Sequence, residues 1–149
     1  MMVMAISQFE RLFREAASLD IDKSDIKRLG DFVNQRLHDL LLLGQAAAKA
    51  NGRDVIQFHD LPVTKGLQEQ MHLFRDMDED IGLGGILDHL AKLPSLDLAY
   101  SEAVEQRLPE LAGGITISLA KVFKAVNPKL KNPASAEWEQ VEKLYQILL

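Results

Sequence analysis

Two long apolar stripes with helical spacing constrain the fold of this chain more than any other feature of its sequence. In each stripe the apolar residues advance by threes and fours, the period at which side chains share one face of an α-helix. The first stripe runs from residue 24 to about residue 50, and the second ends at residue 126. The first is apolar on more than one side, so it must lie centrally and be covered by other helices. The sequence therefore predicts an all-α fold.

The segments that precede the two stripes resemble each other. The first reads Ser-Leu-Asp-Ile-Asp-Lys-Ser over residues 18–24, and the second reads Ser-Leu-Asp-Leu-Ala-Tyr-Ser over residues 95–101, 77 positions later. Each stripe also has shorter amphipathic segments beside it. A unit of short, long and medium helices cannot bury its long helix alone, whereas two clasped copies can. We therefore expect one domain, residues 1–149, that contains a first copy (1–77) and a second, diverged copy (78–149).

Local signals place the helix ends of the first copy. Ser7, with Glu10 three residues later, predicts the start of a helix that ends at Ala17. Ser24 is the expected N-cap of the long helix. Asn51-Gly52 should end that helix, since glycine readily takes the left-handed conformation of a C-cap. Residues 55–58 then form a brief β-like stretch.

The remaining signals concern the junction and the second copy. Asp60 is the expected N-cap of the third helix, with Pro62 tolerated in its first turn. That helix should extend to the acidic run of residues 76–80, which is interpreted as a solvated linker between the copies. Residues 86–93 predict a short helix that ends at Pro94. Residues 128–133 predict a loop, and residues 136–149 a last amphipathic helix that carries Trp138 on its apolar face.

Two features strain the second long helix. Pro109 removes a backbone hydrogen bond, at a cost of about 3 kcal/mol in a regular helix, so we expect a kink or break there. Gly113 and Gly114 lie near the midpoint, where each glycine is unfavourable by about 1 kcal/mol relative to alanine. One explanation for the two adjacent glycines is that the helix is weak and loop-like at this point. We favour close approach of the other long helix, because two backbones come nearer where no Cβ intervenes.

The composition excludes several classes of protein. With no cysteine among 149 residues, the chain has no disulfides, zinc–thiolate sites or thiol nucleophile. The N-terminus lacks the pattern of a signal peptide, and no apolar run approaches the ~18 residues that span a bilayer. We therefore expect a cytoplasmic protein with no membrane partner. The net charge of −5 argues against a protein that coats nucleic acid indiscriminately.

No motif in the sequence assembles an active site. The acidic run resembles a calcium loop, but the positions that need glycine and a final carboxylate hold Ile81 and Leu87. The four histidines are not spaced three or four residues apart, as helical metal ligands would be. No phosphate-binding glycine loop and no nucleophile elbow are present. We therefore expect no catalytic residues, no metal and no cofactor, and a protein that is not an enzyme.

The loop after the first long helix carries a recognisable pattern. It reads Asn-Gly-Arg-Asp-Val-Ile-Gln-Phe-His-Asp-Leu over residues 51–61. Archaeal histones are similar here, with Gly-Arg in the corresponding loop, a β-like pair, and an Asp before the last helix. The resemblance implies a tandem, or doubled, histone fold in which two helix–loop–long helix–loop–helix copies pack as an intramolecular pseudodimer. It also implies that Arg53 and Asp60 form a structural clamp across the loop.

Over nearly its whole length the chain resembles a bacterial family of unknown function in which two histone folds are fused. Segments that carry this resemblance include Leu61-Pro62, residues 65–69, residues 108–113 and residues 131–133. Because the two copies would satisfy each other internally, we expect a monomer. The last loop of the second copy has neither the Gly-Arg nor the clamp Asp.

The residues with which archaeal histones bind DNA are partly replaced. The first loop has no Arg at its start, and three positions of the second loop that face phosphate in the family hold Asp54, Val55 and Gln57. Nucleosome-like wrapping is therefore not expected. The fold would still pair the first loop of one copy with the second loop of the other. That pairing would gather a one-sided basic cluster, to which the first helix would add two arginines: Lys23, Lys27, Arg28, Lys129 and Lys131, with Arg11 and Arg14.

Two hypotheses about function follow. In the first, the chain is a non-enzymatic, histone-like protein that contacts double-stranded DNA without reading its sequence and associates with the nucleoid. In the second, it is a scaffold that binds another protein through the histone fold and binds no DNA. The resemblance and the one-sided lysines favour the first narrowly, whereas the net charge favours the second.

Overall fold

A computed structural model of the chain describes residues 2–82 and 95–148, which are mostly helical. The elements in chain order are α1 (Met2–Ala17), α2 (Lys23–Ala50), β1 (Val55–Ile56), the 3₁₀ turn η1 (Phe58–Asp60), α3 (Lys65–Ile81), β2 (Ala99–Tyr100), α5 (Glu102–Val126) and α6 (Ser135–Leu148). The expectation of a helical fold is confirmed for the described residues, which also contain one two-stranded sheet. The short helix expected over residues 86–93 lies outside the described residues.

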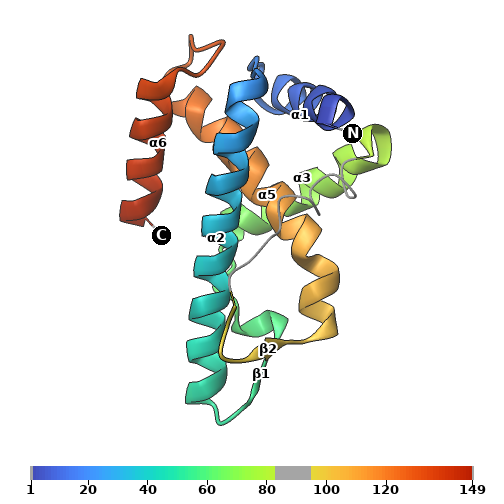
Figure 1. The fold of residues 1–149 in the computed structure, drawn as a ribbon, viewed down its shortest axis with the longest axis vertical. Helices are drawn as coiled ribbons and strands as arrows, with labels where there is room; N and C mark the ends of the chain where they lie inside the picture. Colours follow the sequence, from blue (N-terminus) through green and yellow to red (C-terminus); the bar gives the residue numbers. More distant parts are fainter. Residues whose placement is uncertain (1, 83–94, 149) are drawn as a thin grey trace.

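Helix α5 occupies the centre of the molecule. It packs against α1, α2, α3 and α6, and Figure 1 shows it crossing between α2 and α3. Every residue from Leu111 to Ile117 is buried, so this part of the helix has no solvent-facing side. Most of the apolar surface of both long helices is therefore removed from water within one core, as their apolar stripes require.

The long helix α2 begins at an aspartate and not at the expected serine. Asp22 is its N-cap, and the Asp22 carboxylate accepts hydrogen bonds from the backbone N–H groups of Ser24 and Asp25. In return, the Asp25 carboxylate accepts from the backbone N–H of Asp22 at 3.0 Å. The prediction of Ser24 as N-cap is wrong because two aspartates complete a reciprocal capping box around it. At the other end Asn51 caps the helix and Gly52 is left-handed, with φ of 70°, as predicted.

The chain between α2 and α3 turns once more than the sequence indicates. Asp60 closes the 3₁₀ turn η1, and α3 starts only after Thr64, whose hydroxyl accepts from the backbone N–H of Leu67. Asp60 is therefore not the N-cap of α3, and Pro62 precedes the helix. The acidic run of residues 76–80 belongs to α3, which ends at Gly82 in a left-handed C-cap. Its interpretation as a linker is wrong.

The start of α1 also differs from the prediction. The helix begins at Met2, so Ser7 and Glu10 lie inside it and form no capping box at its start. Local capping signals identify residues that can cap a helix, but an alternative continuation of the helix can leave them unused.

The two strained positions of α5 are accommodated within one helix. The helix is continuous from Glu102 to Val126 with Pro109 inside it, so a break is not observed; Figure 1 shows its axis changing direction between the earlier and later turns. A close approach does occur at Gly113 and Gly114, but the approaching element is α3. A Cβ built on Gly113 would lie 2.2 Å from the Phe74 ring, and one on Gly114 would lie 3.1 Å from the Met71 backbone nitrogen. The prediction that the other long helix approaches is therefore wrong.

Candidate nucleic-acid interface

One end of the molecule is built where the loop before α2 meets the loop before α6. The backbone N–H of Asp20 donates to the carbonyl of Lys131 at 2.6 Å, across 111 positions of sequence. Figure 1 shows these two loops side by side at the top of the view. The Lys124 ammonium lies beneath them and donates to the carbonyls of Ser18 and Leu130. The two loops are thus fixed together by backbone and side-chain bonds.

A buried hydrogen bond fixes the start of α2 against α6 at the same end. The indole N–H of Trp138 donates to the Asp25 carboxylate at 2.9 Å, and the Trp138 ring packs edge-on against Phe123 at 5.0 Å. Trp138 is 1% exposed and Asp25 is 6% exposed. The same carboxylate that closes the capping box of α2 therefore also binds the last helix. This double role holds the first turns of α2 beside the loop before α6.

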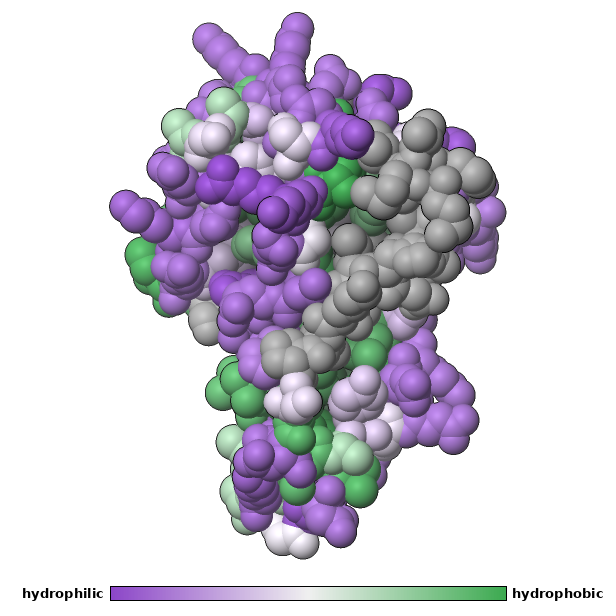
Figure 2. All heavy atoms as spheres, viewed as in Figure 1, coloured by the Kyte–Doolittle hydropathy of each residue, from purple (hydrophilic) through white to green (hydrophobic). Residues whose placement is uncertain are grey.

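Four of the predicted basic residues are exposed at this end. Lys23 and Lys27 lie on the first turns of α2, and Lys129 and Lys131 lie on the loop before α6. Within residues 2–82 and 95–148, none of the four ammonium groups forms an ion pair. We call these four lysines the lysine edge. Figure 2 shows that the surface at this end of the molecule is hydrophilic.

The three predicted arginines are placed nearby but are occupied. Arg28 pairs with Glu142 of α6 at 3.0 Å and lies over the Trp138 ring. On α1, Arg11 pairs with its neighbour Glu15 at 3.2 Å. Arg14 pairs with Asp20 of the following loop at 3.5 Å. These carboxylates pair with the arginines, so the exposed basic side chains of this end that form no ion pair within the described residues are those of the lysine edge.

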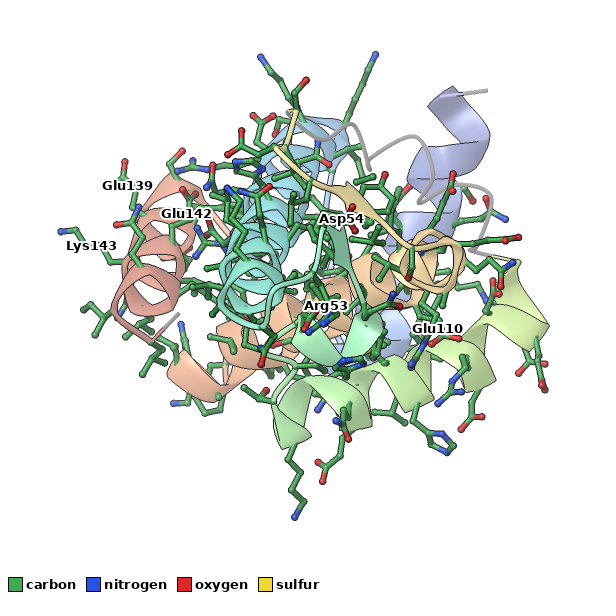
Figure 3. All side chains as sticks on the ribbon, turned by 90° about the horizontal axis from the view of Figure 1, so that it is seen from below. Arg53, Asp54, Glu110, Glu139, Glu142 and Lys143 are labelled. Atoms are coloured by element: carbon green, nitrogen blue, oxygen red, sulfur yellow. The ribbon has the colours of Figure 1, made fainter. Side chains whose placement is uncertain are left out.

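The opposite end of the molecule has a different character. Strand β1 pairs in parallel with β2, with Val55 opposite Ala99 and Ile56 opposite Tyr100. Beside the strands, Lys49 pairs with the exposed Asp97 at 3.0 Å, so a carboxylate lies beside this lysine. In Figure 3 Asp54 is labelled on the loop that enters β1, where it is exposed. This end therefore offers no basic cluster among its described residues.

The predicted pairing of Arg53 with Asp60 is present. The guanidinium holds the carboxylate with two parallel hydrogen bonds, one of them 2.6 Å from Nη1 to Oδ2. The backbone N–H of Gln57 donates to the same carboxylate at 2.7 Å. The Asp60 side chain is only 2% exposed, and its partner Arg53 is 32% exposed. The pair closes the loop and holds η1 against β1, which makes it a structural clamp.

The clamp makes stability depend on pH in the acid range. Hydrogen bonds from Arg53, opposed by burial and helped by the Gln57 N–H, hold the pKa of Asp60 well below its ordinary value. A carboxylate with a depressed pKa stabilises the fold above about pH 4, and this contribution is lost as the pH falls towards its folded pKa. We therefore expect the urea midpoint to fall further between pH 6 and pH 3 in the wild type than in Asp60→Asn. Asp54→Asn, which removes an exposed carboxylate of the same loop, should follow the wild type. Parallel curves for Asp60→Asn and the wild type would show that the clamp does not act through ionised Asp60.

Two other kinds of feature are absent from the part of the chain that the structure describes, a metal-ligand cluster and a membrane-spanning helix. Within residues 2–82 and 95–148, no group of three or more histidine or acidic side chains could hold a metal ion. Over the same ranges, no helix has the length and apolarity that a membrane span requires.

Sequence reasoning missed two residues that build this end of the molecule. Lys124 lies near the end of α5 and was not among the basic candidates, although a basic residue in a last helical turn commonly binds carbonyls there. Asp25 gave no signal beyond its closeness to the helix start. Its bond to Trp138 joins residues 113 positions apart, and no local pattern predicts such a contact.

The chain is similar in sequence to two bacterial proteins. An uncharacterised protein of Aquifex aeolicus is 34% identical over 136 residues, which is 85% of this chain and 81% of the relative. A second from the same organism is 26% identical over 124 residues, covering 83% and 72%.

Two solved structures share the fold over 97% of this chain. A crystal structure of a Thermus thermophilus protein is 49% identical, with a TM-score of 0.86 and 97% of that protein covered. A crystal structure of an Aquifex aeolicus protein, 23% identical with 95% covered, has a TM-score of 0.85 and shows likeness of fold alone. The family described as "Domain of unknown function (DUF1931)" matches residues 9–146, and the chain therefore belongs to this family.

Proposed function

We propose that the chain is a tandem histone fold whose two copies pack as an intramolecular pseudodimer. The order of α1, α2 and α3 supports this, since a long helix lies between two shorter ones, and α5 and α6 repeat the long and final helices. The loop contacts support it further. The loop after α2 pairs with the segment before α5, and the loop before α2 bonds to the loop before α6. Each pairing joins a first loop of one copy to a second loop of the other.

We further propose that the protein is a non-enzymatic DNA-associated architectural protein that holds duplex DNA at the lysine edge. The observation that carries this proposal is the bond between Asp20 and Lys131, because it brings the start of α2 and the loop before α6, which carry the exposed lysines, to one end. Lysine ammonium groups bind phosphate oxygens as point charges and carry no information about base sequence. Contact at one end only, with Asp54, Val55 and Gln57 at the other, suits a local grip and not wrapping.

The arginines would assist the lysine edge only by exchanging partners. Exposed ion pairs such as Arg11 with Glu15 are worth at most about 1 kcal/mol, so a phosphate can displace the carboxylate at low salt. Arg28 is held by Glu142 and by the Trp138 ring, and it exchanges less readily. The four lysines therefore supply most of the binding free energy in this proposal.

A matched pair of charge reversals tests the proposal. Lys129→Glu with Lys131→Glu should weaken binding of a short duplex at least about tenfold at about 50 mM salt, since each lysine neutralises one phosphate. Lys65→Glu with Lys143→Glu makes the same change in net charge away from the edge; Lys143 points outward from α6 in Figure 3. This control should bind within about twofold of the wild type after correction for net charge. Equal losses in both variants, measured by fluorescence anisotropy, would show that the edge has no special role.

The net charge of −5 favours a second candidate, a scaffold that binds a protein partner and no DNA. The same titration separates the two proposals. Saturable binding of a duplex at low salt supports the architectural role. Absence of binding by a folded wild-type protein at low salt would overturn that role and leave the scaffold.

A further inference from the structure

An apolar groove lies on the molecule away from the lysine edge. It has a volume of about 480 Å³ and opens between α2, α5, α6 and the start of α3. This volume falls within the range of pockets that hold small organic molecules, about 300–1,000 Å³. The walls are mostly apolar, and the aliphatic side chains that line them include Leu40, Leu43, Leu67, Ile115, Val122 and Leu148.

A buried guanidinium lines the groove and is incompletely satisfied. Arg36 is 9% exposed, and its Nε is buried with no hydrogen-bond partner in the described part of the chain. Its Nη2 lies 3.2 Å from the Asp39 carboxylate, and the guanidinium lies over the Phe32 ring. A guanidinium has five N–H donors, and a buried donor without an acceptor costs about 1–3 kcal/mol. Nε itself is closed off from the groove, so an acceptor oxygen from outside the chain would bind Arg36 at the part of its guanidinium that lines the groove.

The other polar groups of the groove are already engaged. Asp39 accepts a hydrogen bond from the Gln35 amide at 2.9 Å as well as pairing with Arg36. The hydroxyls of Ser118 and Tyr145 bond to each other at 2.6 Å. Burial raises the pKa of Tyr145, so this hydroxyl remains neutral. The Arg36 guanidinium is thus the polar group of the groove whose hydrogen-bonding capacity is least satisfied by the described residues.

We propose that the groove binds an amphipathic monocarboxylate of fatty-acid type, with its chain along the aliphatic walls and its carboxylate on Arg36. A guanidinium donates a charge-assisted hydrogen bond to a carboxylate, which is stronger than its bond to a neutral hydroxyl and favours this head group. The head group of a cationic amphiphile would be repelled by the Arg36 guanidinium. The second negative charge of a dianion would be repelled by the nearby Asp39 carboxylate. One negative charge on an aliphatic chain therefore fits the groove better than either.

Isothermal titration of the full chain with dodecanoate tests the proposal. We expect saturable binding of one dodecanoate per chain, with a Kd of about 1–100 μM. Dodecyltrimethylammonium carries the same chain with the opposite charge, and butyrate carries the same charge on a short chain. Both should bind at least about tenfold more weakly. No saturable binding of dodecanoate, or equally strong binding of the cation, would overturn the proposal.

Two pairs of variants locate the site. Arg36→Met should weaken dodecanoate binding at least about tenfold, because a charge-assisted hydrogen bond is lost. Arg75→Met, an exposed arginine on α3, should leave it unchanged. Leu148→Asp places a carboxylate at a groove residue that is 76% exposed, and it should weaken binding similarly. Its neighbour Ile147 is 80% exposed and does not line the groove, so Ile147→Asp is the matched control.

If Arg36→Met does not fold, the comparison of Leu148→Asp with Ile147→Asp, both at exposed positions, decides the outcome. Equal affinity of Leu148→Asp and Ile147→Asp for dodecanoate would place the ligand elsewhere and overturn the proposal. Light scattering provides a further outcome. A wild-type dimer that Leu148→Asp dissociates, with no dodecanoate binding in either, would identify the groove as an interface between two copies and would also overturn it.

Discussion

Replacing Gly113 and Gly114 by alanine together should lower the free energy of unfolding by about 3 kcal/mol. In an exposed helix the same changes would stabilise the protein, by about 1 kcal/mol for each glycine. Here the added methyl groups enter space that α3 occupies. A Cβ on Gly113 would lie 2.2 Å from Cγ of Phe74, close to where that side chain leaves its backbone, and Phe74 is 2% exposed. Neither α3 nor the buried ring can move without disturbing the core.

A third glycine provides the control for this prediction. Gly66 lies in the first turn of α3, where an added Cβ would find only the Thr64 hydroxyl, at 4.0 Å. Gly66→Ala should therefore raise the free energy of unfolding by about 0.4–1 kcal/mol. Phe74→Leu in the Gly113→Ala background should recover part of the loss, because the smaller side chain makes room. Urea denaturation followed by circular dichroism measures all of these variants. Alanine variants of both central glycines that match the wild type would contradict the packing of α3 on α5.

Removing the Asp25 carboxylate should destabilise the protein by about 2–3 kcal/mol. Asp25→Ala leaves the buried Trp138 indole N–H without its acceptor, a cost of about 1–3 kcal/mol. It also removes half of the capping box at the start of α2, worth about 1 kcal/mol. The relief of burying one charge offsets part of these losses. Asp31→Ala, an exposed aspartate further along α2, should change stability by less than about 0.5 kcal/mol.

A double-mutant cycle isolates the contact between Asp25 and Trp138. Trp138→Phe keeps an aromatic ring but removes the indole donor. If the hydrogen bond contributes as proposed, the losses in Asp25→Ala and Trp138→Phe should be less than additive in the double variant, with a coupling of about 1–2 kcal/mol. Strict additivity would mean that the two side chains do not stabilise each other. The start of α2 would then be held by other contacts.

Much of the first half of the fold could be predicted because its signals are local. The end of α2 at Asn51 and Gly52 follows from the conformational freedom of glycine. The β-like pair at Val55 and Ile56 follows from a short apolar run between turn residues. The Arg53–Asp60 clamp came from family resemblance, not from local pattern, and it is present.

The errors occurred where distant residues decide between several acceptable local choices. Asp22 and Ser24 are both good N-cap residues, and Asp25, which the distant Trp138 also binds, completes the capping box with Asp22. Asp60 has a capping residue's chemistry, but Arg53 engages its carboxylate instead. For the glycines of α5, the sequence indicated that something comes close, but only the packing identifies α3.

The sequence indicated which basic residues could form the candidate interface, but it did not indicate which of them form ion pairs. The resemblance placed five basic residues at one edge of the fold and two further arginines on the first helix, facing the centre of the expected DNA path. Which of them carry free charge depends on carboxylates from other elements, such as Glu142 of α6 against Arg28. The four lysines of the edge keep unpaired ammonium groups because no acidic side chain of the described residues forms an ion pair with them.

The salt dependence of duplex binding tests the central proposal most directly. Four lysines that each neutralise one phosphate predict a slope of log Kobs against log salt of about −3 to −4 for the wild type. Lys129→Glu with Lys131→Glu should reduce that slope to about −2, while Lys65→Glu with Lys143→Glu should retain it. A slope near zero, or the same slope in the edge variant as in the wild type, would contradict DNA binding at the lysine edge.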